Sequence, residues 1–292
     1  MKDVLRASAR SRSRWQQLCR DLLQPSDPPD LSDSQQQTDS APPAYYNLGG
    51  LLAKTREQQK GAFTRPYYQL VAFTLDECRT RNWQFPPDVI NSSTHISAIT
   101  NTERIQEIQQ EMSQILARCD NEDEDEQKLE RFLFEFLEPA DWRLFLRLKT
   151  TAGGNTLSEM PPSLNECVKA FCTIHRKQSS SSAAAAKPNQ LTVGAKALSK
   201  HWHRDRKTQF WGSNFNGTEA AKNERAEDIL VKILKNTVWR NLHTLPHNEI
   251  VYEVRQSEGY GARWIRRGSN RWEFRGFLEP QMEDGHTVGW IH

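Results

Sequence analysis

Apolar residues in the first half of the chain recur at spacings of three and four, which is the period of a helix with one buried face. The clearest such pattern starts at Tyr67, directly after a proline, and a second starts at Thr102, whose hydroxyl can cap the first turn. A third apolar run is interrupted at Pro139, and Pro162 opens a fourth helix. The pattern therefore predicts a helical region over residues 45–178.

The spacing changes near the C-terminus. A short helix is expected at 194–203 and a long one from about Thr218 to Arg240, with Thr218 as its cap. After Pro246 apolar and polar residues alternate, which is typical of strands. Glycine-containing turns divide this part into a three-stranded meander, and TVGWIH at the end could add a fourth strand. The three strands are expected within residues 249–256, 260–267 and 271–280.

These patterns predict an α+β protein. A helical N-terminal region is followed by a module over residues 191–292, in which the long helix packs on a small antiparallel β-meander. Residues 24–44 are rich in Pro, Ser, Asp and Gln, so we expect a disordered linker there. Residues 179–190 are of low complexity and either separate two domains or interrupt one. Residues 1–23 are a basic amphipathic helix or a cleaved targeting segment.

Composition supports ordered parts joined by polar linkers, because only 36% of the 292 residues are hydrophobic. The net charge of +2 hides an asymmetry, since the chain from Lys187 onward carries 17 Lys and Arg against 12 Asp and Glu. Five scattered cysteines without a CxxC pair indicate reduced thiols, and no apolar run is long enough to span a bilayer. We expect an intracellular protein of the cytoplasm or nucleus, with the mitochondrion as the alternative if residues 1–23 are a presequence.

The segment from Tyr260 to Pro280 combines five arginines with five aromatic rings. Strand parity predicts that Trp272, Phe274, Gly276 and Leu278 face the core and that Arg271, Glu273, Arg275 and Phe277 face outward. On the preceding strand, Arg263 and Arg267 lie opposite Trp264 and Arg266. Gly259 and Gly261 would bring the backbone close to whatever lies above them.

The leading hypothesis is a binding module for RNA, DNA or another phosphate-bearing ligand. Aromatic rings can stack on bases and guanidinium groups can pair with phosphates, as in sheets that bind single strands. Other proteins are also possible partners, and no cofactor is expected. The candidate ligand-binding residues are Arg263, Arg266, Arg275, Trp264, His201, His203, Lys200 and Arg204.

An enzyme is the first alternative. His201 and His203 form an HxH pair, and with His243 and Glu253 they could bind a metal ion or act directly on a phosphate-containing substrate. No nucleotide-binding glycine loop, kinase signature or nucleophile elbow accompanies them. The catalytic residues are therefore left unassigned, and a metal site is kept only as an alternative.

The second alternative is a structural scaffold subunit. Its arginines would then stack on tryptophans and pair with glutamates such as Glu253, Glu273 and Glu279, which would rigidify the sheet. The hypotheses differ on one structural question, which is whether the outward arginines are already neutralised by glutamates of the same chain.

Overall fold

The computed structural model describes residues 17–20, 45–56, 67–90, 102–116, 122–149, 159–175, 190–204, 208–268 and 271–280. The chain forms two compact units. We call them the helical unit (Met1–Ser40 and Arg65–Met160) and the sheet unit (Ala41–Thr64 and Pro161–His292). The predicted domain limits were 45–178 and 191–292, whereas the sheet unit also includes residues 41–64 and the helix that follows Pro162.

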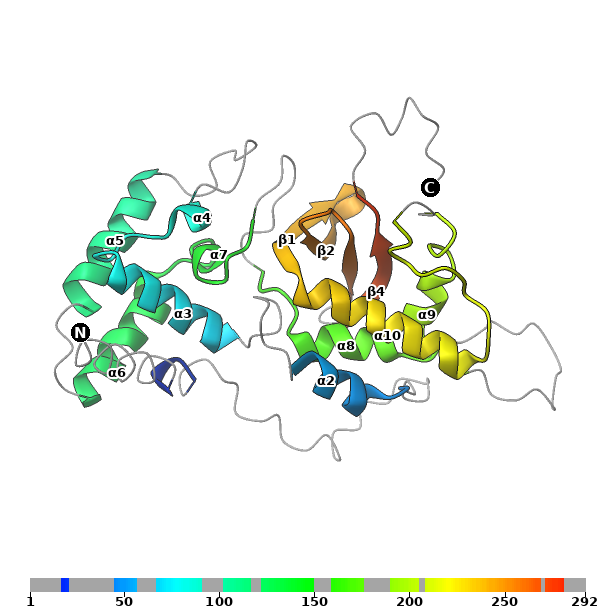
Figure 1. The fold of residues 1–292 in the computed structure, drawn as a ribbon. Coiled ribbons are helices and arrows are strands. Elements are labelled where there is room, and N and C mark those ends of the chain that lie inside the picture. Colours follow the sequence, from blue (N-terminus) through cyan, green and yellow to red (C-terminus); the bar gives the residue numbers. More distant parts are fainter. Residues whose placement is uncertain are drawn as a thin grey trace, which may run out of the picture. The chain divides into compact units, whose positions relative to one another are not determined.

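The helical unit consists of helices and their connections in its described residues (Figure 1). The elements predicted from Tyr67 and Thr102 are present, and the run around Pro139 is divided as expected into separate helical pieces. The elements are α3 (Tyr67–Thr80), α4 (Pro87–Ile90), α5 (Thr102–Leu116), α6 (Glu122–Glu130), the π-helix η2 (Arg131–Phe136) and α7 (Trp142–Phe145).

A cluster of phenylalanines lies within the largely aliphatic core of the helical unit. Phe145 makes edge-to-face contacts with Phe85 at 5.4 Å and with Phe132 at 5.8 Å between ring centroids. A buried ion pair closes the unit, because Arg104 donates from Nη2 to Asp141 Oδ2 at 2.8 Å and to the carbonyl of Phe136 at 2.9 Å. These contacts hold the helices of this unit together.

The sheet unit combines four helices with one antiparallel sheet, which confirms the predicted α+β class. The strands follow one another in the order β1-β2-β3-β4. The helices are α2 (Leu48–Arg56), α8 (Leu164–Cys172), α9 (Val193–Leu198) and α10 (Glu219–Lys235). The strands are β1 (Thr237–Leu245), β2 (Glu249–Gln256), β3 (Gly261–Arg267) and β4 (Arg271–Leu278), with the 3-10 turn η3 (Pro246–Asn248) between β1 and β2.

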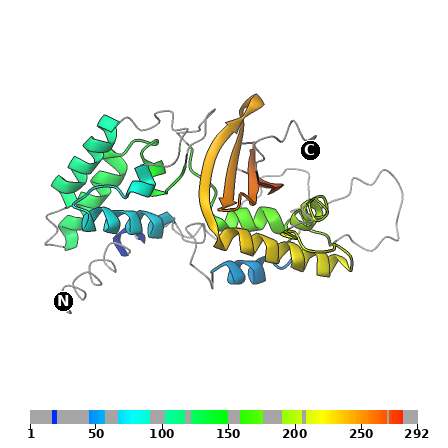
Figure 2. The same cartoon turned by 45° about the horizontal axis from the view of Figure 1, so that its top comes forward.

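The helices cover one face of the sheet. Helices α8, α9 and α10 pack against the sheet, and α2 packs on α8 and α10 on the side away from the sheet (Figures 1 and 2). Trp264 of β3 is fully buried under α8 and donates its indole N–H to the carbonyl of Cys167 at 2.9 Å. Phe171 of α8 packs edge-to-face on Phe274 of β4 at 4.9 Å. We call the opposite side of the sheet the outer face.

Helix α10 begins as predicted, because Thr218 accepts the backbone N–H of Ala221 at its N-terminus. It ends at Lys235, however, and not near Arg240. The residues from Thr237 to Leu245 instead form β1, which the sequence analysis missed. Val238 continues the apolar spacing of the helix, yet it lies in β1 with 63% of its surface exposed. The short helix expected at 194–203 likewise ends early, at Leu198.

The parity prediction fails in the second half of β4. The register between β3 and β4 shifts between Arg263 and Trp264, so one extra residue of β4 is accommodated there. Gly276 adopts a φ of 148° at this bulge, and it pairs with outward-facing Arg263. Phe277, expected outside, is therefore buried against Phe171 at 6.1 Å between centroids, while Gly276 and Leu278 move to the outer face.

Several predictions fall on residues that the structure does not describe. They are the linker at 24–44, nearly all of the segment at 179–190, most of the N-terminal helix at 1–23 and the extra strand TVGWIH. No helix in the described ranges is long and apolar enough to cross a membrane.

Gly261 permits the close pairing of β2 and β3. A Cβ atom at this position would lie far inside van der Waals contact of the Val254 carbonyl oxygen and would touch the Arg255 side chain. The sequence predicted a close approach at this glycine, and the neighbour that approaches it is strand β2 of the same sheet.

We expect Gly261→Ala to destabilise the sheet unit by about 1–3 kcal/mol, because a backbone oxygen cannot move aside as a side chain can. Denaturant unfolding of the full chain measures this change. Gly49→Ala is the matched control, since nothing lies within 4 Å of its added Cβ and alanine favours the helix there. Equal stability of the two variants would contradict the explanation.

Candidate functional site

The outer face of the sheet carries a buried glutamate at its centre. Glu253 of β2 lies between Asn241 of β1 and Arg263 of β3 in the strand register. Its surface is only 4% exposed, although no helix covers this face in the described residues. A carboxylate is costly to bury without partners, so its surroundings must supply compensating charge.

Two arginines and one histidine surround the Glu253 carboxylate. Arg255 donates from Nε to Oε1 at 2.6 Å, and Arg263 donates to Oε2 from Nε at 2.9 Å and from Nη2 at 2.7 Å. His243 of β1 places Nε2 3.6 Å from the same Oε2. We call these four residues, from three adjacent strands, the Glu253 cluster.

The cluster keeps Glu253 ionised. Burial acts to raise the pKa of this carboxyl, but the nearby imidazole of His243 and the charges of Arg255 and Arg263 outweigh it and lower the pKa to about 2. Glu253 is therefore an anion at neutral pH and cannot serve there as a proton donor. What it can do is orient the imidazole of His243 and the guanidinium of Arg263.

A second histidine and glutamate meet nearby. His201, in the turn after α9, contacts the Glu279 carboxylate through Nδ1, and Arg204 Nη1 lies 3.6 Å from the same Oε1. The imidazole is held between Trp211 and Phe277 at centroid distances of 5.4 and 6.1 Å. Burial would raise the pKa of Glu279, but His201 and Arg204 lower it overall. We call His201, Arg204 and Glu279 the Glu279 cluster.

Arg255 joins the two clusters. Its Nη1 donates to the carbonyl of Glu279 at 3.0 Å and to the carbonyl of Gly259 at 2.7 Å, while its Nε holds Glu253. Gly259 adopts a φ of +88° and lies against Pro280, so the β2–β3 turn and the end of β4 are fixed together. The two histidine–glutamate pairs thus belong to one connected polar network at this end of the sheet.

At the other end of the sheet, the arginines are also paired. Arg267 donates to Glu249 at 2.6 Å and lies 3.8 Å from Glu273, which also accepts from Arg271. Arg275 lies 3.9 Å from Glu249. These pairs are solvent-exposed, so each contributes little to the stability of the sheet. A phosphate could therefore replace the glutamate partner at a small cost in free energy.

The candidate residues from the sequence do not form one group. Trp264 lies in the core and is fully buried, which excludes it from stacking on a ligand in this structure. Arg266 pairs with Trp272 on the helix-covered side of the sheet. His203 and Lys200 are exposed in the turn after α9, whereas His201 is 8% exposed, so the two imidazoles of the HxH pair separate. Arg263, His201 and Arg204 belong to the two clusters, and Arg275 lies with the exposed pairs.

The residues of the alternative metal site do not come together either. His243 contacts Glu253, but His201 contacts Glu279, and His203 joins neither. In the described ranges of the chain, no three His, Cys, Asp or Glu side chains come close enough together to hold a metal ion.

Asn241 is the outer-face residue that the sequence analysis overlooked. It is fully buried beside Glu253, in the strand that was predicted as helix. The run TVWRNLHTL does contain the signal, because it is rich in β-branched and aromatic residues and alternates around Leu242.

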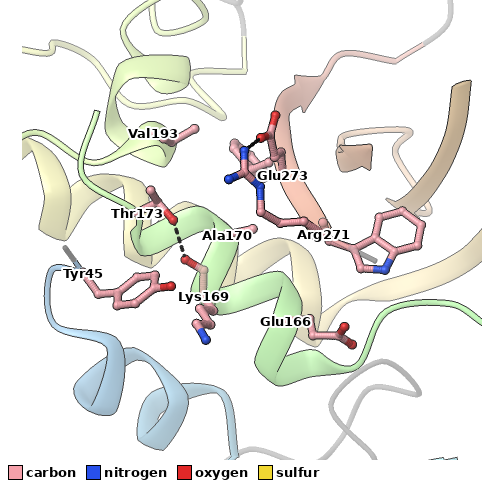
Figure 3. Close-up of a pocket in the computed structure, with 10 residues that line it drawn as sticks. Tyr45, Glu166, Lys169, Ala170, Thr173, Val193, Arg271 and Glu273 are labelled. Carbon is pink, nitrogen blue, oxygen red and sulfur yellow. Dashed lines mark hydrogen bonds and ion pairs between the residues drawn. The ribbon is translucent and has the colours of Figure 1, made fainter. Parts of the chain in front are cut away.

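A hollow of about 490 Å³ lies beside β4, between α8 and the segment that starts at Tyr45 (Figure 3). Its cations are matched by acids, because Lys169 and Arg271 share the lining with Glu166 and Glu273. Glu166 is engaged in the capping box of α8, and Glu273 accepts from Arg271 (Figure 3). This hollow therefore presents a balanced charge.

Comparison with known proteins adds one finding. A family model described as the CdiA C-terminal tRNase toxin domain matches residues 180–279, about a third of the chain. The matched part of the sheet unit is similar to a tRNase toxin domain. No curated protein and no solved structure matched the chain.

The match covers both clusters. It begins before His201 and ends at Glu279, so it contains α9, α10 and the whole sheet. Helices α2 and α8 and the entire helical unit lie outside it. A similarity to a tRNase domain agrees with the nucleic-acid interpretation in its general form and favours RNA as the partner.

Proposed function

We propose that the sheet unit binds RNA and cleaves its phosphodiester backbone at the outer face of the sheet. One observation carries the proposal. All seven residues of the two clusters, from His201 to Glu279, lie within the stretch that resembles a tRNase domain, and they join imidazole, guanidinium and carboxylate groups in one connected network. These are the groups that phosphodiester cleavage needs for proton transfer and charge stabilisation.

Arg263 is the residue that would hold the scissile phosphate. Its Nε and Nη2 are committed to Glu253, which fixes the guanidinium plane, while Nη1 has no acceptor among the described residues. A quarter of its side chain is exposed. A guanidinium held in this way can donate to a phosphate oxygen without first losing conformational freedom.

His243 is the candidate general base. When its Nε2–H donates to Glu253, the neutral ring keeps its lone pair on Nδ1, and the nearby carboxylate stabilises the imidazolium that forms on proton transfer. Histidine is suited to this role because its ordinary titration range lies near neutral pH.

The proposed step is an internal transesterification. Nδ1 of His243 removes the proton of a ribose 2′-hydroxyl, and the 2′-oxygen forms a bond to the adjacent phosphorus. The bond from phosphorus to the 5′-oxygen breaks, and that oxygen takes a proton from solvent. The products are a 2′,3′-cyclic phosphate and a 5′-hydroxyl end, and Arg263 stabilises the charge on the phosphoryl oxygens in between.

Transfer RNA is the substrate that we propose, on the basis of the family's description. Proteins that recognise an RNA sequence mostly bind loops whose nucleotides are unpaired and splayed, so we propose that a loop of the tRNA is cleaved.

We expect the full chain to cleave tRNA and single-stranded RNA but not DNA of the same sequence, because the 2′-hydroxyl is the nucleophile. Cleavage should persist in a chelator, since the proposed step uses only protein groups. Gel analysis with end-group mapping measures both. Cleavage of DNA, or 5′-phosphate ends on the RNA products, would contradict the mechanism.

Binding of RNA without cleavage would restrict the function to a binding module. An oligonucleotide with one 2′-deoxyribose at the mapped cleavage position serves as the matched substrate control. It should bind like RNA and resist cleavage at that position alone.

A further inference from the structure

A second hollow, of about 790 Å³, lies at the C-terminal end of α10. The end of α10, the start of β1, the β2–β3 turn and Pro280 form its walls. We call it the Lys232 hollow. Its volume is in the range of sites that accept a nucleotide-sized ligand. The residues used below are Phe210, Lys232, Lys235, Glu258, Tyr260 and Pro280.

Two lysines of this hollow are not held in ion pairs. Neither Lys232 nor Lys235 forms an ion pair within the described part of the chain, in contrast to the arginines of the outer face. Glu258 is the only acid among the lining residues, and its carboxylate accepts from the hydroxyl of Ser257 at 2.9 Å. Its own backbone N–H, this hydroxyl and the charge of Lys232 lower the pKa of Glu258, so one acid stands against two lysines. The hollow therefore keeps an excess of positive charge.

An aromatic stack holds Lys232 in place. Its Nζ lies 3.9 Å from the ring centroid of Phe210, which is stacked on Tyr260 at 3.8 Å with parallel planes. The hydroxyl of Tyr260 in turn contacts Thr208 at 2.9 Å. An ammonium group held over a ring loses less freedom when it binds an anion than a freely moving lysine does.

The Lys232 hollow adjoins the proposed cleavage site. Pro280 and Tyr260 line the hollow, and Gly259, which packs on Pro280, accepts from Arg255 of the Glu253 cluster. Arg255 also donates to the carbonyl of Glu279, the residue before Pro280, so the two sites are joined through this part of the backbone. An RNA strand on the outer face could thus reach the hollow by passing over this edge.

We propose that the Lys232 hollow is a backbone-phosphate subsite, in which Lys232 and Lys235 bind an RNA phosphate flanking the one that is cleaved. The inference rests on the proposed RNA-cleaving function, and it places the part of the RNA next to the cleaved phosphate. The hollow beside β4 (Figure 3) does not compete for this role, because its lysine and arginine share the lining with two glutamates.

The test compares the double variant Lys232→Ala/Lys235→Ala with wild type in the full chain. We expect KM for a single-stranded RNA to rise about tenfold with kcat nearly unchanged, because the subsite binds ground state and transition state alike. In binding experiments on a His243→Ala background, the slope of log K against log salt should become shallower by about 1 to 1.5.

Two further variants make the result interpretable. Lys222→Ala removes a lysine that also lies over a ring, Phe215 at 5.6 Å, but at the other end of α10, and it should leave both readouts unchanged. Lys232→Arg/Lys235→Arg keeps the charge and should restore the slope, which separates charge from packing.

If wild type cleaves RNA and the double alanine variant matches Lys222→Ala, the subsite is disproved while the proposed function stands. If wild type neither binds nor cleaves RNA, the proposed function fails and the subsite with it. A loss of kcat that the arginine variant does not restore would also overturn the inference, because it would indicate a packing effect on the catalytic network.

Discussion

Replacing His243 with alanine is expected to lower the rate of RNA cleavage by about 10²–10⁴-fold, the range that general-base catalysis contributes. The loss should appear in kcat, because the imidazole acts on the 2′-hydroxyl proton and Arg263 still holds the phosphate. Affinity for RNA should change little, since His243 is only 13% exposed and carries no proposed phosphate contact. Single-turnover cleavage and equilibrium binding of the same RNA measure the two effects.

His247→Asn is the matched control for this variant. His247 lies in the exposed turn between β1 and β2, with a φ of 70° that asparagine tolerates, and it touches neither cluster in the described residues. Its activity should equal that of wild type. Full activity of His243→Ala would show that another group is the general base. His201 in the Glu279 cluster would then be the first candidate to test.

The sequence predicted the fold class because most elements have a local signal. Helices such as α3, α5 and α10 carry their own apolar period and capping residue, and β2, β3 and most of β4 alternate regularly. Strand β1 was missed for a specific reason. Val238 follows Leu234 by four residues, so helical spacing continues across the real boundary at Lys235. The sheet overrides this spacing, since β1 pairs along β2 from Thr237 to Leu245.

The site was less predictable because it depends on register. A single bulge at Gly276 exchanges the faces of Gly276 and Phe277, and strand parity alone cannot reveal it. The pairing of His201 with Glu279 joins residues 78 positions apart, across a helix and the whole sheet. Composition indicated an excess of arginine, but it could not show that Glu253 would hold two of those arginines.

The arginine–glutamate pairs of the sheet are compatible with both the binding hypothesis and the scaffold hypothesis. Arg255 has a structural role, because it donates hydrogen bonds to Glu253 and to two backbone carbonyls. Arg263 is different, since the same Glu253 orients it while its Nη1 meets no acceptor in the part of the chain that the structure describes. A glutamate partner therefore does not remove an arginine from function, and in this network it fixes the donor that we propose for the phosphate.

Glu253→Gln is expected to destabilise the sheet unit by about 2–4 kcal/mol at pH 7, because it removes the charge that Arg255 and Arg263 surround. This is less than the roughly 3–5 kcal/mol for breaking a fully buried pair, since the two arginines are 15% and 25% exposed and water can partly compensate them. Hydrogen exchange of the β2 and β3 amides, measured against denaturant, reports on this unit separately from the helical unit.

The pH dependence of stability is a second test of the Glu253 carboxylate. The pKa of Glu253 is about 2 in the folded protein, below its ordinary value of 4.5, so the unfolded chain binds the proton more readily. Its stabilisation is fully present above pH 4.5 and is lost as the pH falls toward 2, a change of up to about 3 kcal/mol.

Glu253→Gln should lack this acid-dependent loss. Glu249→Gln, which removes an exposed partner of Arg267, should retain it and cost less than about 1 kcal/mol at pH 7. An unchanged acid profile in Glu253→Gln would show that other carboxylates govern acid unfolding and that the cluster does not hold Glu253 as described.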